Sequence, residues 1–203
     1  MIKGGGIRMN DIRLCTKPKL RFFDILEALS NLQCLSTLEG TQKTKEQQTS
    51  EYFTFVMDDQ STLVHLINDQ STSIPYLLLS GPDHRKLAYH LYQSGMVYSS
   101  KDIQYRCLHD QHVDDRIDAI CRLGIASYDE ASSEVLDIFQ LYLRDPDVRV
   151  RQSAVFATSF IGWREFEDML VYTATHDPDS RVAEIAESAL RIMRESDWIS
   201  ERA

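Results

Sequence analysis

The C-terminal half of the chain carries apolar residues at the spacing of amphipathic helices. Between residues 133 and 143 they recur in steps of three and four, and a second series of this kind begins at Phe166. Such steps bring apolar side chains to one side of a helix, where a neighbour can bury them. The two series are Val135, Leu136, Phe139, Tyr142 and Leu143, and Phe166, Leu170 and Thr173. We therefore expect helices here that each bury one face.

A short polar motif recurs between these series. The segment 145–154, with the sequence DPDVRVRQSA, is echoed 32 residues later by DPDSRVAEIA. Related segments begin at Asp110 and, with less similarity, at Pro82. Proline fits the first turn of a helix, and an aspartate there accepts backbone N–H groups and meets the positive end of the helix dipole. The motif therefore predicts four helix starts and an array of antiparallel helix pairs of about 32 residues each. A small residue occupies the same place in each copy, where it lets the following helix pack closely: Ala88, Ala119, Ala154 and Ala186.

These repeats resemble the HEAT repeat family, including the variant of phycobilin lyase subunits, in which Leu-x-Asp-Pro-Asp-x-x-Val-Arg-x-x-Ala precedes Ala-Leu-Gly. Segment 116–119 with Leu123-Gly124 matches the end of that pattern, and Val150-Arg151 with Ala154 matches its beginning. The departures are Ala183 in place of arginine and Thr158-Ser159 in place of Leu-Gly. The resemblance is clear over residues 108–194 and weaker over 74–107, where the apolar run 74–79 would end one helix pair. It implies an all-α, right-handed superhelix and no single activity.

The N-terminal part has a less regular pattern. Residues 19–34 carry apolar side chains every three residues and predict an amphipathic helix, and the polar stretch 39–50 predicts a mobile loop. Segments 51–57 and 62–68 fit two structures. Their composition suits a β-hairpin with a turn at 58–61, but the repeat rhythm favours helices with Ser61 as an N-cap.

The sequence thus predicts an all-α fold, with a short hairpin near 51–68 as the alternative. It divides the chain into a disordered basic tail (1–18), a helix with a polar loop (19–58) and a repeat domain (59–203). The segment KGGGIR before Met9 is what a purine-rich ribosome-binding site would encode, so we expect Met9 to be the natural start of a bacterial gene.

The negative charge is concentrated in the repeat half. Residues 101–203 hold 21 Asp and Glu against 12 Lys and Arg, whereas the first 100 residues hold 10 of each. A protein that grips duplex DNA needs cations to displace counterions from the phosphates, so this half does not suit nucleic acid. An acidic surface favours a basic partner protein, although surplus acid can also serve only solubility.

The remaining composition points to the cytoplasm. The longest apolar runs fall far short of a membrane span, and residues 1–8 do not resemble a signal peptide. The four cysteines, Cys15, Cys34, Cys107 and Cys121, are scattered without a CxxC pair, as expected of apolar filler in a reducing compartment.

The candidate chemical motifs are weak. Cys107, His109 and His112 are three metal-ligand types close together, but no second cluster follows at zinc-finger spacing. The segment 80–83 could hold an anion at a helix start, and it fits better as a cap. Nucleophile-elbow, phosphate-loop, dinucleotide and zinc-protease motifs are missing from the sequence. We therefore predict no catalytic site, no metal and no cofactor.

The arginines and aspartates at the helix starts predict ion-pair ladders between neighbouring repeats. By the family resemblance, the second helix of each pair lines a concave face, which would carry Glu134, Asp137, Gln140, Glu167 and Asp168, with Trp163 nearby. Carboxylates steer a basic ligand and a buried tryptophan can anchor it, whereas the plainer alternative is a solvated helix face.

We therefore expect a non-catalytic module that binds or inhibits a basic partner protein, one version being a bacterial toxin-immunity protein. The alternatives are an enzyme or chaperone subunit of the bilin lyase type, a nucleic-acid glycosylase, which the acidity disfavours, and a structural homo-oligomer.

Overall fold

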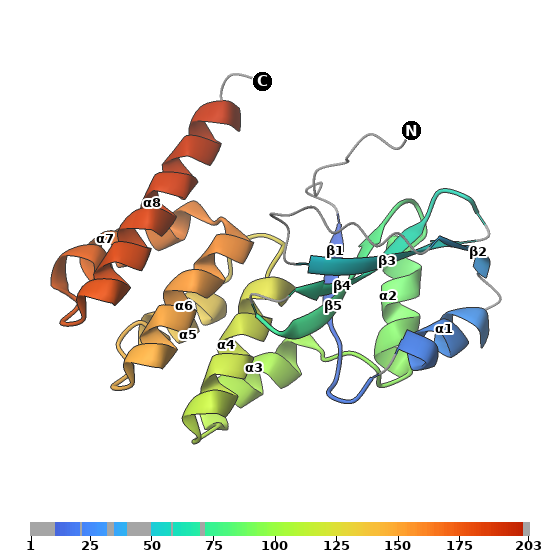
Figure 1. The fold of residues 1–203 in the computed structure, drawn as a ribbon, viewed down its shortest axis with the longest axis horizontal. Helices are drawn as coiled ribbons and strands as arrows, with labels where there is room; N and C mark the ends of the chain where they lie inside the picture. Colours follow the sequence, from blue (N-terminus) through green and yellow to red (C-terminus); the bar gives the residue numbers. More distant parts are fainter. Residues whose placement is uncertain are drawn as a thin grey trace. The chain divides into compact units, whose positions relative to one another are not determined.

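The computed structural model describes residues 11–20, 22–31, 35–39, 50–57, 59–69 and 72–200. The chain divides into two compact units, a sheet unit of residues 1–99 and a helical unit of residues 100–203 (Figure 1). The predicted all-α fold is therefore wrong, because the first unit is built on a β-sheet.

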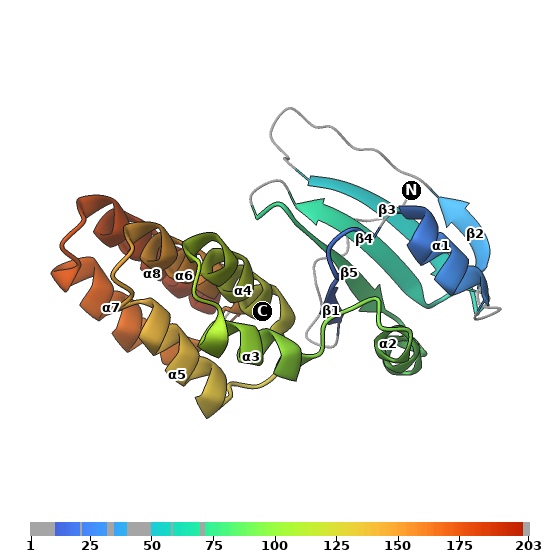
Figure 2. The same ribbon diagram turned by 90° about the horizontal axis from the view of Figure 1, so that it is seen from below.

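The sheet unit contains an antiparallel sheet of five described strands in the order β1-β5-β4-β3-β2. Consecutive strands β2 to β5 are neighbours, and β1 pairs with β5 at the far edge (Figure 2). The strands are β1 (Ile12–Cys15), β2 (Leu35–Glu39), β3 (Ser50–Met57), β4 (Leu63–Asp69) and β5 (Ile74–Ser80).

Strands β3 and β4 form the hairpin that the sequence left as its alternative, so the preference for helices over 51–68 is wrong. Side chains in β3 alternate: Phe55 and Met57 are buried, and Thr54 and Val56 on the other side are half-buried. Phe55 pairs with Val64, which is also buried. β-branched and aromatic residues fit such a pleated surface, and this period of two outweighs the repeat rhythm of the distant helices.

The apolar run 74–79 is also a strand and does not end a helix pair, which corrects the second helical expectation. Strand β5 lies between β1 and β4, and Tyr76, Leu77, Leu78 and Leu79 are all buried. A strand covered on both faces has no polar alternation, so its sequence alone does not distinguish it from a buried helix.

A compact turn joins β3 to β4. The Asp59 carboxylate accepts hydrogen bonds from the backbone N–H groups of Ser61 (2.9 Å) and Thr62 (2.7 Å) and from the Thr62 hydroxyl. Gly81, which follows β5, lies against this turn with φ at +101°. A Cβ there would collide with the Ser61 carbonyl oxygen and lie 2.7 Å from the Thr62 Cα, so the position requires glycine.

Two helices belong to the sheet unit, α1 (Phe22–Asn31) and α2 (His84–Gln93). The first confirms the predicted N-terminal helix, and it buries Ile25 and Leu29. The second begins at the weakest copy of the helix-start motif, but it packs against β1 and β5. At this copy the motif correctly predicted that a helix begins. The prediction that this helix packs against other helices is wrong, because it packs against strands.

The predicted domain boundaries change accordingly. Strand β1 (12–15) lies within the expected disordered tail, and a boundary at residue 59 falls in the β3–β4 hairpin. The repeat region begins instead at residue 100. Residues 1–10, most of the expected loop 39–50, and Cys34 lie outside the described residues.

The helical unit consists of three antiparallel helix pairs, α3/α4, α5/α6 and α7/α8. Figure 2 shows α3, α5 and α7 in one row and α4, α6 and α8 in the other. The bounds are α3 (Ser100–His109), α4 (Val113–Ala126), α5 (Ser133–Tyr142), α6 (Val148–Ile161), α7 (Glu167–His176) and α8 (Ser180–Ser200), with a 3-10 turn η1 (Arg164–Phe166) before α7.

The motif begins α4, α6 and α8, which are the second helices of their pairs. The helices expected to be second and to carry the contact residues, α5 and α7, are instead the first of their pairs. At α6 the Asp147 carboxylate accepts a hydrogen bond from the Arg149 backbone N–H at 2.8 Å. The motif alanines Ala119, Ala154 and Ala186 are fully buried. Gly124 brings α4 against α6 so closely that a Cβ would lie 2.7 Å from the Ala157 carbonyl oxygen.

Candidate functional site

Two bidentate ion pairs join successive pairs of helices. Arg116 of α4 contacts both carboxylate oxygens of Asp145 at 3.1 Å. Arg151 of α6 holds Asp177 in the same way, at 2.8 and 3.0 Å. The two arginines lie six residues after Asp110 and Asp145 respectively. A ladder between repeats is therefore present, but its aspartates are Asp145 and Asp177, whereas the helix-start residues Asp147 and Asp179 pair with Arg149 and Arg181 within their own turns. The corresponding place in α8 is Ala183, at which the ladder ends.

A second charged cluster connects α3 with α4. The Asp118 carboxylate accepts hydrogen bonds from Arg106 of α3 at 2.6 Å and from Arg122 at 2.8 Å. Burial alone would raise the pKa of Asp118, but the hydrogen bonds and charges of the two guanidinium groups outweigh it and lower the pKa. The cluster keeps Asp118 ionised and has a structural role.

The predicted contact residues lie along one row of helices. Glu134, Asp137 and Gln140 are exposed on α5, and Asp168 is exposed on α7. Phe139 of α5 packs on Phe166 with ring centroids 4.8 Å apart, which holds α5 beside the start of α7. The structure thus gathers these carboxylates on neighbouring helices.

Three of the predicted contact residues already have partners inside the unit. Hydrogen bonds from the Ser132 hydroxyl and the Ser133 hydroxyl help lower the pKa of Glu134, which stays ionised. Glu167 pairs with Arg194 of α8 at 2.8 Å. The Trp163 indole N–H donates to the Asp129 carbonyl oxygen at 2.8 Å. The Trp163 ring also stacks on Phe166, so it fastens the α4–α5 loop to η1 and is only half-buried.

The same row exposes large apolar and aromatic side chains that the sequence analysis did not select. Tyr105 is 63% exposed, Leu141 is 57% exposed and Tyr172 is 56% exposed. Tyr105 stacks on His109 with centroids 4.0 Å apart, and Tyr172 stacks on His176 at 4.5 Å. Tyr105 stands five residues before Asp110, and Tyr172 stands five residues before Asp177. Aligning the repeats on these aspartates would therefore have shown that the two tyrosines are equivalent.

We call this surface the α3–α5–α7 face and define it by exposed residues at equivalent places in the three helices. It comprises Asp102, Tyr105 and His109 on α3, Asp137 and Gln140 on α5, Arg144 just after α5, and Asp168, Tyr172 and His176 on α7, together with the exposed Leu141 beside Gln140.

The possible metal ligands do not form a cluster. Cys107 is buried, where desolvation raises the pKa of its thiol to about 12, whereas His109 and His112 are exposed. Among the described residues, no three His, Cys, Asp or Glu side chains are grouped closely enough to hold an ion.

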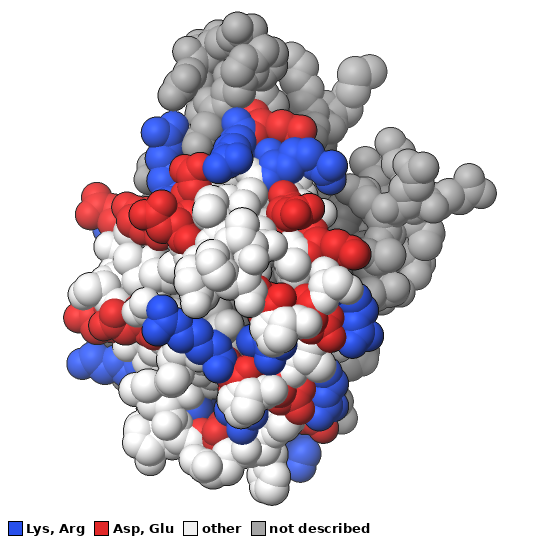
Figure 3. Space-filling model, turned by 90° about the vertical axis from the view of Figure 1, so that its left-hand side faces the viewer, with Lys and Arg blue, Asp and Glu red and all other residues white. Residues whose placement is uncertain are grey.

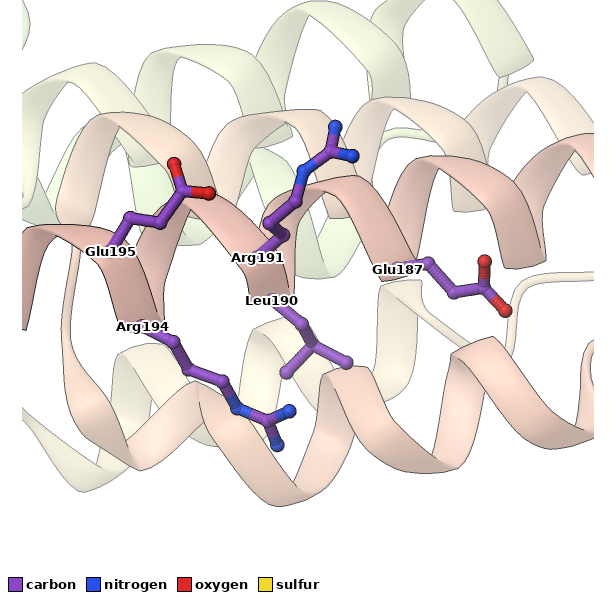
Figure 4. A pocket seen from close by; sticks show the side chains of 5 residues that line it. All are labelled: Glu187, Leu190, Arg191, Arg194 and Glu195. Carbon is purple, nitrogen blue, oxygen red and sulfur yellow. The ribbon is translucent and has the colours of Figure 1, made fainter.

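A groove of about 510 Å³ runs beside α8. Its described lining comes from this helix alone, as Figure 4 shows, and consists of Glu187, Leu190, Arg191, Arg194 and Glu195. An active site normally brings groups from several elements to one point, which this described lining does not do. Figure 3 views the α7–α8 end of the helical unit, where positive and negative side chains are interspersed. The surplus acid therefore does not form a single patch there.

Comparison with protein-family models, with curated proteins and with solved structures finds no match to this chain. The likeness of residues 108–194 to HEAT repeats therefore stays a prediction. In the part of the chain that the structure describes, no helix combines the length and the apolar character that crossing a membrane requires.

Proposed function

We propose that the helical unit is a non-catalytic module that binds a basic partner protein through the α3–α5–α7 face. One observation carries the proposal: exposed tyrosines and a leucine share one row of helices with carboxylates, where α3 contacts α5 and the buried Phe139 of α5 packs on Phe166 just before α7. Tyrosine is enriched in protein interfaces because its ring offers a large contact area at a small entropic cost. Carboxylates beside it attract cationic side chains.

The six residues selected from the sequence divide into two groups under this proposal. Asp137, Gln140 and Asp168 are exposed, and we propose them as direct contacts. Glu134, Trp163 and Glu167 have partners inside the unit, so we assign them a smaller share of the binding energy.

We propose a cytoplasmic location for the protein. The described cysteines Cys15, Cys107 and Cys121 are free and buried, which suits a reducing compartment. A toxin-immunity role remains one concrete version of the proposal. The enzyme, chaperone and homo-oligomer alternatives have no specific observation in their favour among the described residues.

The test uses a fluorescent twelve-residue oligolysine as the probe and the full chain as the binder. Reversing two carboxylates of the face, Asp137→Lys with Asp168→Lys, should weaken binding about tenfold, because each exposed charge pair is worth up to about 1 kcal/mol. Anisotropy titrations at two salt concentrations measure this loss, which should shrink at high salt.

The matched control reverses two exposed carboxylates away from the face, Glu130→Lys with Glu184→Lys. It makes the same change in net charge and should weaken binding about threefold or less. Equal losses in the two double variants would mean that only net charge matters, and the proposed face would be refuted.

A further inference from the structure

The α3–α5–α7 face has an internal order that its overall acidity does not reveal. Counted back from the motif aspartates Asp110, Asp145 and Asp177, equivalent residues share an acidic position on all three helices and a tyrosine and a histidine position on α3 and α7, whereas α5 has Gln140 and Arg144 at the latter two. Asp102, Asp137 and Asp168 stand eight or nine residues before them, and His109, Arg144 and His176 stand one residue before them. Tyr105, Gln140 and Tyr172 stand five residues before them, with Leu141 beside Gln140.

The three helices therefore present three stripes. Each helix of the row is followed by a turn into its partner, so the three run in the same direction (Figure 2). Helix α3 contacts α5, and Phe139 of α5 packs on Phe166 just before α7.

Asp102 and Asp168 lie in the first turns of α3 and α7, whereas Asp137 lies in the middle of α5. Tyr105, Leu141 and Tyr172 follow the aspartates along the three helices. His109 and His176 end α3 and α7, and Arg144 follows the end of α5.

The dimensions of the stripes indicate what can cover them. Seven residues separate Asp137 from Arg144, which is about 10 Å along a helix at 1.5 Å per residue. That separation equals the width of one α-helix with its side chains, about 10–12 Å, and exceeds the roughly 5 Å spacing of a single strand. From α3 to α7 the face spans two helix spacings, or about 18 Å, which about 12 helical residues would cross.

We infer that this face takes an amphipathic helix of the partner, with a Lys/Arg edge, an apolar middle and a Glu/Asp edge. The inference rests on the proposed function and identifies the class of partner that it requires. The basic edge lies along Asp102, Asp137 and Asp168, where a cation can also approach the tyrosine rings. The apolar middle covers Leu141 and the two tyrosines, and the acidic edge meets Arg144.

The experiment compares two designed helical peptides of about 16 residues as probes, long enough to exceed the estimated crossing of the face. They share the apolar face and one lysine edge, and their second edge is glutamate in the dipolar peptide and lysine in the doubly basic peptide. Against an acidic protein, net charge alone favours the doubly basic peptide. The three-stripe face should instead bind the dipolar peptide at least about threefold more tightly, because its glutamates meet Arg144.

Two variants of the protein isolate the cause. Arg144→Glu should reverse the preference by about tenfold, because it replaces attraction to the glutamate edge by repulsion. Arg191→Glu makes the same charge change on α8, away from the face, and should leave the preference unchanged. Circular dichroism checks that both variants remain folded.

The outcomes separate the two levels of the proposal. If the doubly basic peptide binds as tightly as the dipolar one and Arg144→Glu changes nothing, the striped face is overturned. The broader proposal survives that result provided that Asp137→Lys with Asp168→Lys still weakens oligolysine binding more than its control does. If neither peptide nor oligolysine responds to changes on this face, both proposals fail together.

Discussion

The helical unit repeats its contacts, whereas each contact in the sheet unit occurs once. Arg116 meets Asp145 and Arg151 meets Asp177 in the same bidentate geometry, at equivalent places in successive repeats. In the sheet unit the Asp59 turn and the Gly81 approach meet at one place, and the described residues of that unit do not repeat the combination.

The comparison shows that the two units fix their packing register by different interactions. Helix pairs of similar sequence could stack in several registers, and a paired charge at each junction penalises every register that leaves it unmatched. A sheet obtains its register from apolar alternation and from its turns, because a slip of one residue would expose the buried face. Substitutions at the charged junctions and at the turn can break this distinction.

The largest expected effect is the loss of one ion-pair partner in the helical unit. The Arg151 and Asp177 side chains are only 10% and 3% exposed, so Arg151→Met leaves a buried carboxylate without its cation. We expect the helical unit to lose about 3–4 kcal/mol of stability, while the sheet unit is unaffected. Hydrogen exchange resolved by peptide mass spectrometry measures the two units separately.

A matched substitution tests whether burial is the cause. Arg181 pairs with Asp179 but its side chain is 69% exposed, so Arg181→Met should leave the stability of the helical unit nearly unchanged. The double variant Arg151→Met with Asp177→Asn should recover part of the loss, because it removes the unpaired charge. Similar losses for Arg151→Met and Arg181→Met would show that the ladder does not stabilise the unit.

The second prediction compares two glycines, one in each unit. Gly124→Ala should cost the helical unit about 2 kcal/mol, because the new methyl group would press on the Ala157 carbonyl and force α4 and α6 apart. Gly81→Ala should cost the sheet unit about 2–3 kcal/mol, because backbone strain at positive φ adds to the collision with the hairpin turn.

Gly95 provides the control for strain without collision. Its φ is +74°, and a Cβ there would meet nothing within 4 Å, so Gly95→Ala should cost only about 1 kcal/mol. Thermal unfolding followed by the same hydrogen-exchange comparison assigns each loss to its unit. If Gly81→Ala and Gly95→Ala cost the same stability, the collision with Ser61 and Thr62 would not contribute to the effect at Gly81.

The smallest expected effect concerns the β3–β4 turn and its dependence on pH. Burial opposes ionisation of Asp59, but hydrogen bonds from Thr62 and Ser61 outweigh it and lower the pKa below the ordinary value of 3.8. A lowered carboxyl pKa stabilises the fold above the ordinary value, and this contribution disappears as pH falls through the folded pKa. Asp59→Ala should therefore cost about 1 kcal/mol at pH 7 and progressively less below pH 3.8.

Melting curves of the wild type and Asp59→Ala between pH 7 and the acid limit of stability provide the measurement. The other carboxylates are the same in both proteins, so their contribution to the pH dependence cancels in the difference between the two melting curves. A difference that stays constant below pH 3.8 would contradict the assignment of the effect to the Asp59 carboxylate.

Sequence reasoning succeeded where the controlling contacts are local. The Asp-Pro-Asp motif begins α6 and α8 because its carboxylates, its proline and the N–H groups that they affect lie within one turn of helix. The amphipathic helix α1 and the ladder between repeats were predictable for the same reason, since each follows from residues at fixed offsets. Of the α3–α5–α7 face, Asp137, Gln140 and Asp168 were predicted, whereas Asp102 and the tyrosines were not, because exposure of an aromatic side chain depends on which helices pack against it.

The sequence by itself determined that residues 108–194 form paired helices whose starts are set by Asp and Pro. Only the tertiary structure decided between helix and strand for segments 51–57 and 74–79, because an inner strand needs neighbours on both sides, and one neighbour of β5, the strand β1, is distant along the chain. Leu77 pairs with Leu14 on one side and with Leu66 on the other. A strand has no hydrogen bonds of its own to reveal it, so its identity depends on neighbours that become adjacent only when the chain folds.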